Sequence, residues 1–496
     1  MNLPPFKLER YFAKYEFNTE FLLCSSDCEA MSIADLLAFE EGAAEKLQNT
    51  WLGYTESQGS PALRKEICNI YTTMQPENIL VHTGAGEAIY LFMHAMLKDN
   101  DHIIVHSPHY QSLSEVAKGI GCQISPWLAR EENDWALDLN ELRHLMRTTT
   151  KAVIINMPNN PTGYLMSRTD FDELNKFVQE KKLLLFSDEV YRESEYDPAI
   201  RLPAACDYGE HAVSLGVTSK TYGLAGLRIG WIATKNKKVY ENMASLKDYT
   251  TICNSAPSEL LAEVAMRHRQ KLIDRNLGII KTNLAVVDDF FAAHSSLFTW
   301  VRPQAGSMGF PKLLKGDIEK FCDDLVRKAG VLLLPGTMYD DSRNHFRLGL
   351  GRKNFPQGIE RLNEYLGKKQ VHDSPIFCKI CNYSYFPSIA GESEHHEKFH
   401  ESAVKGIQIR ISKLDRVIAK NNDYQLIIID SNSTLPQFNR LNKISKFISA
   451  SLFRDNFTYH VRLLFPVVPE HKFFLLCTKS RIIGYFDIKF FPKKHR

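Results

Sequence analysis

The sequence lacks an apolar run long enough to span a bilayer, and its N-terminus, MNLPPFKLERYFAKYEF, lacks the apolar core of a signal peptide. These absences predict a soluble protein that is not secreted and does not use a membrane, with a cytoplasmic location or, alternatively, a nuclear one. Only 10 of the 496 residues are cysteine, and in such a chain they are expected to be reduced thiols or metal ligands. No internal repeat or low-complexity tract occurs, so a repeat architecture is excluded.

The net charge of +3 hides an uneven distribution along the chain. Residues 401–496 carry 17 Lys and Arg against 7 Asp and Glu, a formal charge of about +10, which leaves about −7 for residues 1–400. An acidic body with a basic C-terminal segment suggests two units of different origin. The basic segment either makes the chain soluble or binds a protein or nucleic-acid partner.

Short apolar runs alternate with helical patterns between about residues 40 and 245. The runs are PENILVHTG, DHIIVHSP, KAVIINMP, KKLLLFSDEV and HAVSLGV. Their Val, Ile and Leu content is typical of strands buried on both faces of a mostly parallel sheet. Between them lie GEAIYLFMHAMLK and RTDFDELNKFVQEKK, the second with Thr169 or Asp170 as its expected N-cap. This alternation predicts an α/β domain with helices on both faces of the sheet.

Polar or glycine-rich residues follow these strands at the ends where open parallel sheets bind ligands. The first run leads into TGAGEA, a turn into a helix whose unpaired N–H groups suit a phosphate. The later runs lead to Tyr110, Asn160, Asp188 with Tyr191, and Lys220. Each of these is ordinary turn chemistry when taken alone. Together and in this order, they indicate a shared site.

The segment from about residue 5 to 367 resembles the class I and II aminotransferases, which are pyridoxal-phosphate enzymes of fold type I. The motifs that carry the resemblance are NNPTG, SDEVY, SKTYGLAGLRIGW and FRLGLG. The resemblance implies a large and a smaller α/β domain, and amino acid and 2-oxo acid substrates. It also implies a homodimer.

The same resemblance assigns cofactor roles to residues of this chain. Lys220 would bond the cofactor aldehyde and then move the α-proton. Asp188 would pair with the pyridinium nitrogen, Tyr191 and Asn160 would bind the phenolic oxygen, and Tyr110 would stack on the ring. The phosphate would be held by Arg228 and by the backbone of Ala85 and Gly86.

Three further positions follow from the comparison with that family. Tyr54, in WLGYTESQGSPALR, would reach the phosphate of the neighbouring subunit, and Arg347 would grip the substrate α-carboxylate. Val217 departs from the pattern, because a serine is common there, and Thr218 or Ser219 would have to supply the missing hydroxyl. Substrate selectivity is expected to depend on LLCSSDCEAM and AGSMGF, which do not reveal the substrate.

The segment CKICNYSYFPSIAGESEHHEKFH carries a second candidate site. Cys378 and Cys381 have CxxC spacing, and His396 and His400 are spaced to lie on one face of a helix. Such a set suits a structural, tetrahedral Zn²⁺ site, with His395 as an alternative ligand. A chance cluster is the other interpretation.

From Cys378 to about Ile488 the chain resembles the zinc finger and the first part of the sister-chromatid cohesion acetyltransferases. No RxxGxG-like loop for acetyl-CoA follows Ile488, so we expect a partial α+β segment and no acetyl transfer. The predicted organisation is an N-terminal arm (1–40), a cofactor-binding large domain (41–245), a small domain (246–367), a C2H2-type finger (376–402) and the partial segment (403–496).

Three functions remain open from the sequence. The leading hypothesis is a pyridoxal-phosphate-dependent aminotransferase. The same lysine, aspartate and arginine also serve lyases, synthases and cyclases, which the sequence does not separate from it. The third is a catalytically silent binding protein that uses the finger, against which the intact Lys220, Asp188 and Arg228 argue.

Overall fold

The computed structural model describes residues 3–372, 376–378, 384–385, 391–405, 407–408, 416–420, 425–429, 471–477 and 481–489. The chain divides into two compact units, residues 1–365 and 366–496. The domain boundaries expected inside these units stay predictions. No described helix is long and apolar enough to cross a membrane.

A seven-stranded sheet forms the centre of the first unit. Its spatial order is β2 (Ile79–His82), β8 (Gly230–Ala233), β7 (Ala212–Val217), β6 (Leu184–Asp188), β5 (Thr150–Asn156), β3 (His102–Ser107) and β4 (Gln123–Leu128). β8 runs antiparallel to both of its neighbours, β2 and β7, and all other neighbouring pairs are parallel. The five expected strands are confirmed. The edge strand β4 and the antiparallel β8 had not been predicted.

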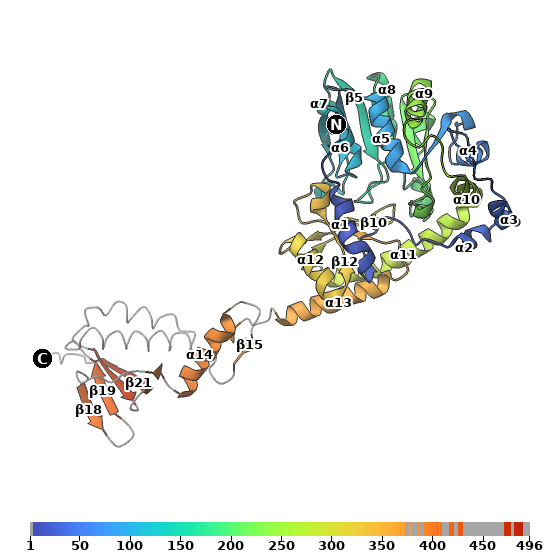
Figure 1. The fold of residues 1–496 in the computed structure, drawn as a ribbon. Helices are drawn as coiled ribbons and strands as arrows, with labels where there is room; N and C mark the ends of the chain where they lie inside the picture. The colour runs from blue at the N-terminus through green and yellow to red at the C-terminus, as the bar shows by residue number, and fades with distance from the viewer. Residues whose placement is uncertain are drawn as a thin grey trace. The chain divides into compact units, whose positions relative to one another are not determined.

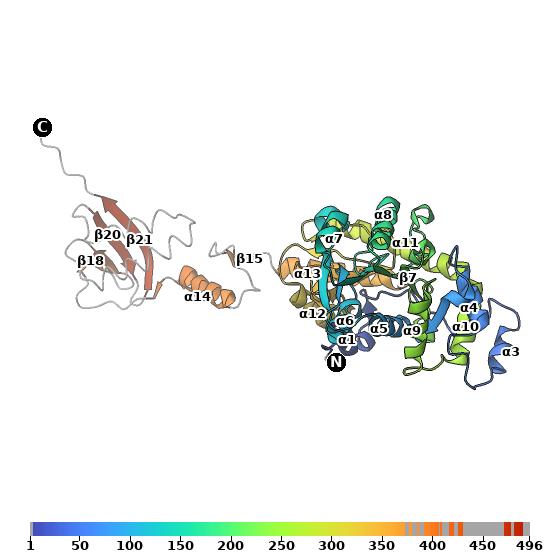
Figure 2. The same ribbon diagram turned by 90° about the horizontal axis from the view of Figure 1, so that it is seen from above.

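Successive residues of the central strands enter different hydrophobic clusters. Ile104, Val153 and Leu185 belong to the cluster that α8 supplies with Phe171 and Leu174. Their alternating neighbours Val105, Ile154 and Phe186 belong to the cluster that α5, α6 and α9 supply. The two helical layers lie on opposite sides of the strands (Figure 2). Strands buried on both faces are rich in apolar residues, as these are, although they also carry buried polar residues such as His106 and Ser214.

Fourteen α-helices occur in the described part of the chain. They are α1 (Lys7–Tyr15), α2 (Ile33–Leu37), α3 (Ala43–Gln48), α4 (Pro61–Cys68), α5 (Ala85–Met96), α6 (Ser112–Ile120), α7 (Leu139–Leu145), α8 (Arg168–Glu180), α9 (Lys237–Lys247), α10 (Ala256–Arg267), α11 (Arg269–Ala293), α12 (Ile318–Ala329), α13 (Phe355–His372) and α14 (Glu392–Lys405) (Figure 1). The N-cap of α8 is Ser167, whose side chain accepts a hydrogen bond from the backbone N–H of Asp170. The predicted cap was therefore two or three residues too late, because Thr169 and Asp170 already lie inside the helix.

A smaller region of the same unit is built from short strands around α11 and α12. The strands are β9 (Phe298–Thr299), β10 (Met308–Gly309), β11 (Lys312–Leu313), β12 (Val331–Leu332), β13 (Leu334–Pro335) and β14 (Phe346–Gly349). The N-terminal segment joins this region, since β1 (Phe21–Leu22) pairs with β12. Gly349 is required there, because a Cβ at this position would lie 2.0 Å from the carbonyl oxygen of Ser25.

The described residues of the second unit form two strand groupings and α14. A short hairpin joins β15 (Ile376–Phe377) to β16 (Ser384–Tyr385). An antiparallel sheet has the order β17 (Ile407–Gln408), β21 (Arg481–Lys489), β20 (His471–Cys477), β19 (Gln425–Ile429) and β18 (Arg416–Lys420). The resemblance of this unit to an acetyltransferase stays a prediction.

Candidate active site

The carboxyl ends of the parallel strands surround a cavity of about 490 Å³ in the first unit. Every predicted cofactor and substrate residue of this unit except Tyr54 lines it, namely Ala85, Gly86, Tyr110, Asn160, Asp188, Tyr191, Lys220, Arg228 and Arg347. The structure thus brings together residues that are up to 262 positions apart in the chain. Tyr54 is 82% exposed and does not line the cavity of its own chain.

Lys220 follows β7 and places its amine inside the cavity. Its Nζ donates a hydrogen bond to the Ser26 hydroxyl, 2.9 Å away. Burial lowers the pKa of Lys220, and Asp27 partly opposes this effect. A lowered pKa increases the fraction of neutral amine, which is the nucleophilic and basic form.

Asp188, the last residue of β6, is buried beside this lysine. Burial raises the pKa of Asp188 to about 7, although the backbone N–H of Val190 donates to its carboxylate at 3.2 Å. A buried carboxylate without a cationic contact is costly in its charged form. The site is therefore prepared for a positively charged group next to Asp188.

Arg228 lies against the N-terminus of α5. A Cβ at Gly84, the N-cap of that helix, would be 2.5 Å from Arg228 Nη2, so the guanidinium would have to shift to make room for it. Gly84 also has φ +83°, which favours glycine. The arrangement places a guanidinium beside the unpaired N–H groups of Ala85 and Gly86, which together suit a phosphate dianion.

Ser219 places a hydroxyl in the cavity close to Arg228, whereas Val217 offers none. Its side chain lines the cavity and lies 3.5 Å from Arg228 Nη1. Thr218, the other candidate, is buried and donates to the backbone carbonyl of Ile229 at 3.0 Å. Of the two, only Ser219 is therefore in position to contact a ligand at this corner.

Asn160 and Tyr191 present polar groups to the cavity. The Asn160 Oδ1 accepts from Tyr339 at 2.9 Å and from Arg347 at 3.3 Å, which leaves its amide nitrogen as a donor. The Tyr191 hydroxyl is buried and has no hydrogen-bond partner of good geometry among the described residues. Such an orphaned group indicates a missing ligand atom, and the donor set fits the phenolic oxygen of pyridoxal phosphate.

Arg347 is a buried cation without a protein counter-ion. It is 1% exposed, and no carboxylate of the described residues lies within 4 Å of it. Its Nε donates to the Cys24 carbonyl at 2.8 Å and its Nη1 to Tyr339 and Asn160, whereas its Nη2 makes no hydrogen bond within the described part of the chain. A buried guanidinium in this state is ready for an anionic ligand.

The N-terminal part of the chain contributes residues that the sequence did not reveal. Glu9 and Phe12 of α1, together with Glu16, line the cavity, and so do Ser26 and Asp27. The last two belong to LLCSSDCEAM, which was expected to affect selectivity. From AGSMGF, Ser307 acts indirectly, since its hydroxyl donates to the Ser26 carbonyl at 2.8 Å.

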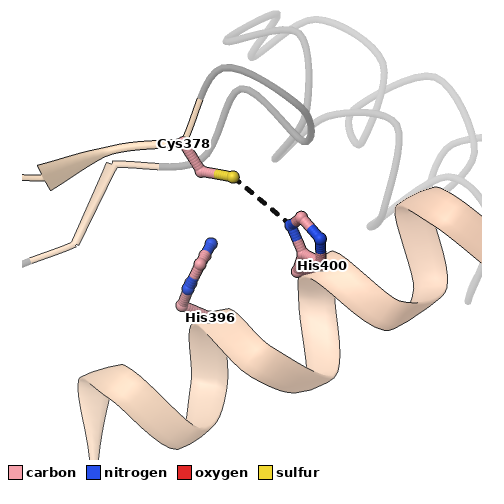
Figure 3. A group of neighbouring side chains, drawn as sticks. All are labelled: Cys378, His396 and His400. Carbon is pink, nitrogen blue, oxygen red and sulfur yellow. Dashed lines mark hydrogen bonds between the residues drawn. The ribbon is translucent and has the colours of Figure 1, made fainter.

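Three of the four predicted metal ligands lie together in the second unit. One ligand atom each from Cys378, His396 and His400 lies within 4.8 Å of the others, and both histidines project from the same face of α14 towards the cysteine (Figure 3). The Cys378 Sγ is 3.3 Å from His400 Nδ1. Cys381 lies outside the described residues.

Comparisons with known proteins agree with the cavity. The family model described as aminotransferase class I and II matches residues 20–362. Capreomycidine synthase from Streptomyces vinaceus is 28% identical over 74% of this chain and 94% of its own length. An aspartate aminotransferase from Sulfurisphaera tokodaii is 25% identical over 66% and 85%. The crystal structure of a PLP-dependent aminotransferase from Streptococcus suis 89-1591 is similar, with 34% identity, a TM-score of 0.70 and coverage of 74% of this chain and 99% of that one.

Proposed function

Because the chain belongs to the class I and II aminotransferases, and is therefore a pyridoxal-phosphate-dependent enzyme, we propose that it transfers an amino group between an amino acid and a 2-oxo acid. The observation that carries the proposal is the pairing of the Lys220 amine with the counter-ion-free Arg347 in one cavity. The amine bonds the cofactor and works at the α-carbon, and the guanidinium binds the α-carboxylate next to it.

The residues present fit the cofactor at each of its polar groups. Arg228, Ser219 and the N–H groups of Ala85 and Gly86 would hold the phosphate, and Asp188 would accept from the ring nitrogen. Asn160 and Tyr191 would bind the phenolic oxygen, and Tyr110 would pack on the ring. When bound, pyridoxal phosphate supplies an aldehyde that bonds to amines and a ring that accepts electrons from the α-carbon.

Lys220 performs the proton transfer in this proposal. Its Nζ, which Ser26 positions and whose pKa burial lowers, removes the proton from the substrate α-carbon. Arg347 holds the substrate carboxylate by charge-assisted hydrogen bonds and so fixes the α-carbon near that amine. The low exposure of Arg347 excludes water, which strengthens this contact.

Two measurements test the proposal. Purified protein should show the visible absorbance of lysine-bound cofactor, and Lys220→Ala should lose it together with at least about a thousandfold of activity. In a single turnover without an acceptor, an amino donor should yield one equivalent of 2-oxo acid and no ammonia. A wild-type protein that takes up no cofactor would contradict the enzyme assignment and leave a silent binding protein.

A lyase, synthase or cyclase is the second candidate. The similarity to capreomycidine synthase over almost the full length of that protein favours it. The same single-turnover experiment separates the two, because release of ammonia or of a β-substituent in place of a 2-oxo acid supports the second candidate.

The proposed assembly is a homodimer in which Tyr54 completes the partner's site. Trp51, Leu52 and Tyr54 are about four-fifths exposed in one chain, which is unusual for large apolar side chains and favours a covered surface. When Lys220→Ala and Tyr54→Ala proteins are mixed and exchange subunits, activity should be restored. In the resulting heterodimer, one of the two active sites has both an intact Lys220 and an intact Tyr54. Activity that is not restored would place Tyr54 outside the shared site.

We also propose a structural Zn²⁺ ion bound by Cys378, Cys381, His396 and His400. The convergence of three of these ligands on one point supports it. Metal analysis should find one zinc per chain, which is lost in His396→Asn and retained in the matched control His395→Asn. Retention of zinc in both variants would contradict these ligands. A protein or nucleic-acid partner of the basic segment stays a prediction.

A further inference from the structure

The N-terminal part of the chain lines the active-site cavity with three carboxylates. Glu9 lies on α1, Glu16 follows the end of that helix, and Asp27 lies beyond β1. Glu9 and Glu16 are seven residues apart, or about two helical turns, so both point to the same side of the helix as Phe12. The cavity wall that α1 provides is therefore acidic.

Two of these carboxylates have no cationic partner. Asp27 is bound by Arg352 through two contacts of 3.0 and 3.1 Å. Glu9 accepts a hydrogen bond from the Tyr110 hydroxyl at 3.3 Å, and neither Glu9 nor Glu16 has a basic side chain within 4 Å among the described residues. Partial burial raises the pKa of Glu16, Asp27 and Glu9 raise it further, and the more distant Arg352 and Arg347 partly oppose this rise. Arg352, Arg347 and Lys220 thus compensate the negative charge of the wall only in part, and none of them is in direct contact with Glu9 or Glu16.

The cations of the same cavity have other tasks under the proposed function. Arg228 serves the phosphate and Lys220 the cofactor aldehyde. Arg347 is the independent sign of a ligand, because it is almost fully buried in this cavity without a counter-ion and needs an anion. A ligand that satisfies Arg347 and the acidic wall together carries a carboxylate and a cation.

We propose that the substrate is an amino acid whose side chain ends in a guanidinium or ammonium group, which Glu9 and Glu16 bind while Arg347 holds the α-carboxylate. This inference rests on the proposed function and narrows it to one substrate class. It also implies that aspartate and glutamate are poor substrates, because their side-chain carboxylates would meet like charge. Glu9 and Glu16 are then specificity-determining residues.

The test compares pairs of ligands in which one member has a cationic side-chain terminus and the other a neutral one. Arginine and citrulline have nearly the same shape, and lysine and norleucine differ in the terminal ammonium. With the holoenzyme, the cationic member of each pair should react at least about tenfold faster at low concentration, as expected for a charge-assisted contact. Binding of 5-guanidinopentanoate against 5-ureidopentanoate, measured by calorimetry, gives the same ratio without any turnover.

Variants of Glu9 and Glu16 then test whether these carboxylates cause the preference for cationic ligands. Glu9→Gln and Glu16→Gln should each bring the cationic-to-neutral ratio closer to one, whereas the exposed matched control Glu20→Gln should keep the wild-type ratio. A wild-type ratio near one, in both turnover and calorimetry, overturns the substrate class but leaves the proposed function if cofactor absorbance and 2-oxo acid release persist. Absence of the cofactor absorbance overturns both.

Discussion

The cofactor side and the N-terminal side of the cavity are built in different ways. The cofactor side consists of single residues at the ends of β3, β5, β6 and β7, each fixed by a sheet that is buried on both faces. The N-terminal side consists of α1 and an extended segment, which join the smaller region through the pairing of β1 with β12, through apolar packing, and through hydrogen bonds such as that of Tyr11 to the Leu333 carbonyl at 2.8 Å. The comparison suggests that the first side sets the chemistry and the second sets the substrate.

The largest expected effect comes from Asp188→Asn on the cofactor side. Activity should fall about a thousandfold, because the charge facing the ring nitrogen is lost. The cofactor-free variant should nevertheless be more stable than wild type at pH 8, by about 3–4 kcal/mol, and equally stable near pH 4.

The sign follows from the pKa of Asp188, which is raised from 3.8 to about 7 in the folded protein. Between these values the folded state holds a proton that the unfolded state has lost, so wild-type stability falls as the pH rises from about 4 to 7. Thermal melts of both proteins from pH 4 to 8 measure this difference. Parallel curves would show that Asp188 titrates normally.

Arg228→Gln should weaken cofactor binding by about 300-fold, because the phosphate loses a charge-assisted pair of hydrogen bonds. Titration of the apoenzyme with pyridoxal phosphate, followed by absorbance, measures this loss. Arg302→Gln is the matched control, since that side chain is exposed and pairs with Asp288 at 2.9 Å outside the cavity. Equal losses of cofactor affinity in both variants would contradict a specific role of Arg228 in phosphate binding.

Arg347→Gln should weaken substrate binding without affecting cofactor binding, and so separate the roles of the two sides of the cavity. We expect KM for the amino donor to rise about 100-fold while the cofactor absorbance persists, because Arg347 faces the substrate carboxylate. Steady-state kinetics together with the absorbance spectrum provide the measurement. If the cofactor were also lost, the two sides would not be independent.

The smallest effect concerns the corner at Val217. Ser219→Ala should weaken cofactor binding about fivefold, as expected for the loss of one neutral hydrogen bond, and Val217→Ser should strengthen it by a similar factor. The same titration measures both. If Ser219→Ala leaves the affinity for the cofactor unchanged, Ser219 does not replace the hydroxyl that is missing at Val217.

The comparison also explains which parts were predictable from the sequence. Lys220, Asp188 and Asn160 lie in short motifs whose strand, turn and residue type are local, so their common location followed from the rule for parallel sheets. Glu9 and Glu16 look like solvated charges in the sequence, and only the packing of α1 against the smaller region brings them into the cavity. Strand β4 was missed because Pro126 and its exposed alternate residues resemble a loop.

The close contact of Gly349 with Ser25 affects which length of substrate fits the cavity. Arg347 lies two residues before Gly349 and is bonded to the Cys24 carbonyl, so the carboxylate grip and the segment of Ser26 and Asp27 form one piece. Any motion of the smaller region then carries both ends of the substrate-binding surface together. The distance between Arg347 and the segment of Ser26 and Asp27 is therefore fixed, and under the proposed function a substrate one methylene too short reaches only one end of this surface, whatever its charge.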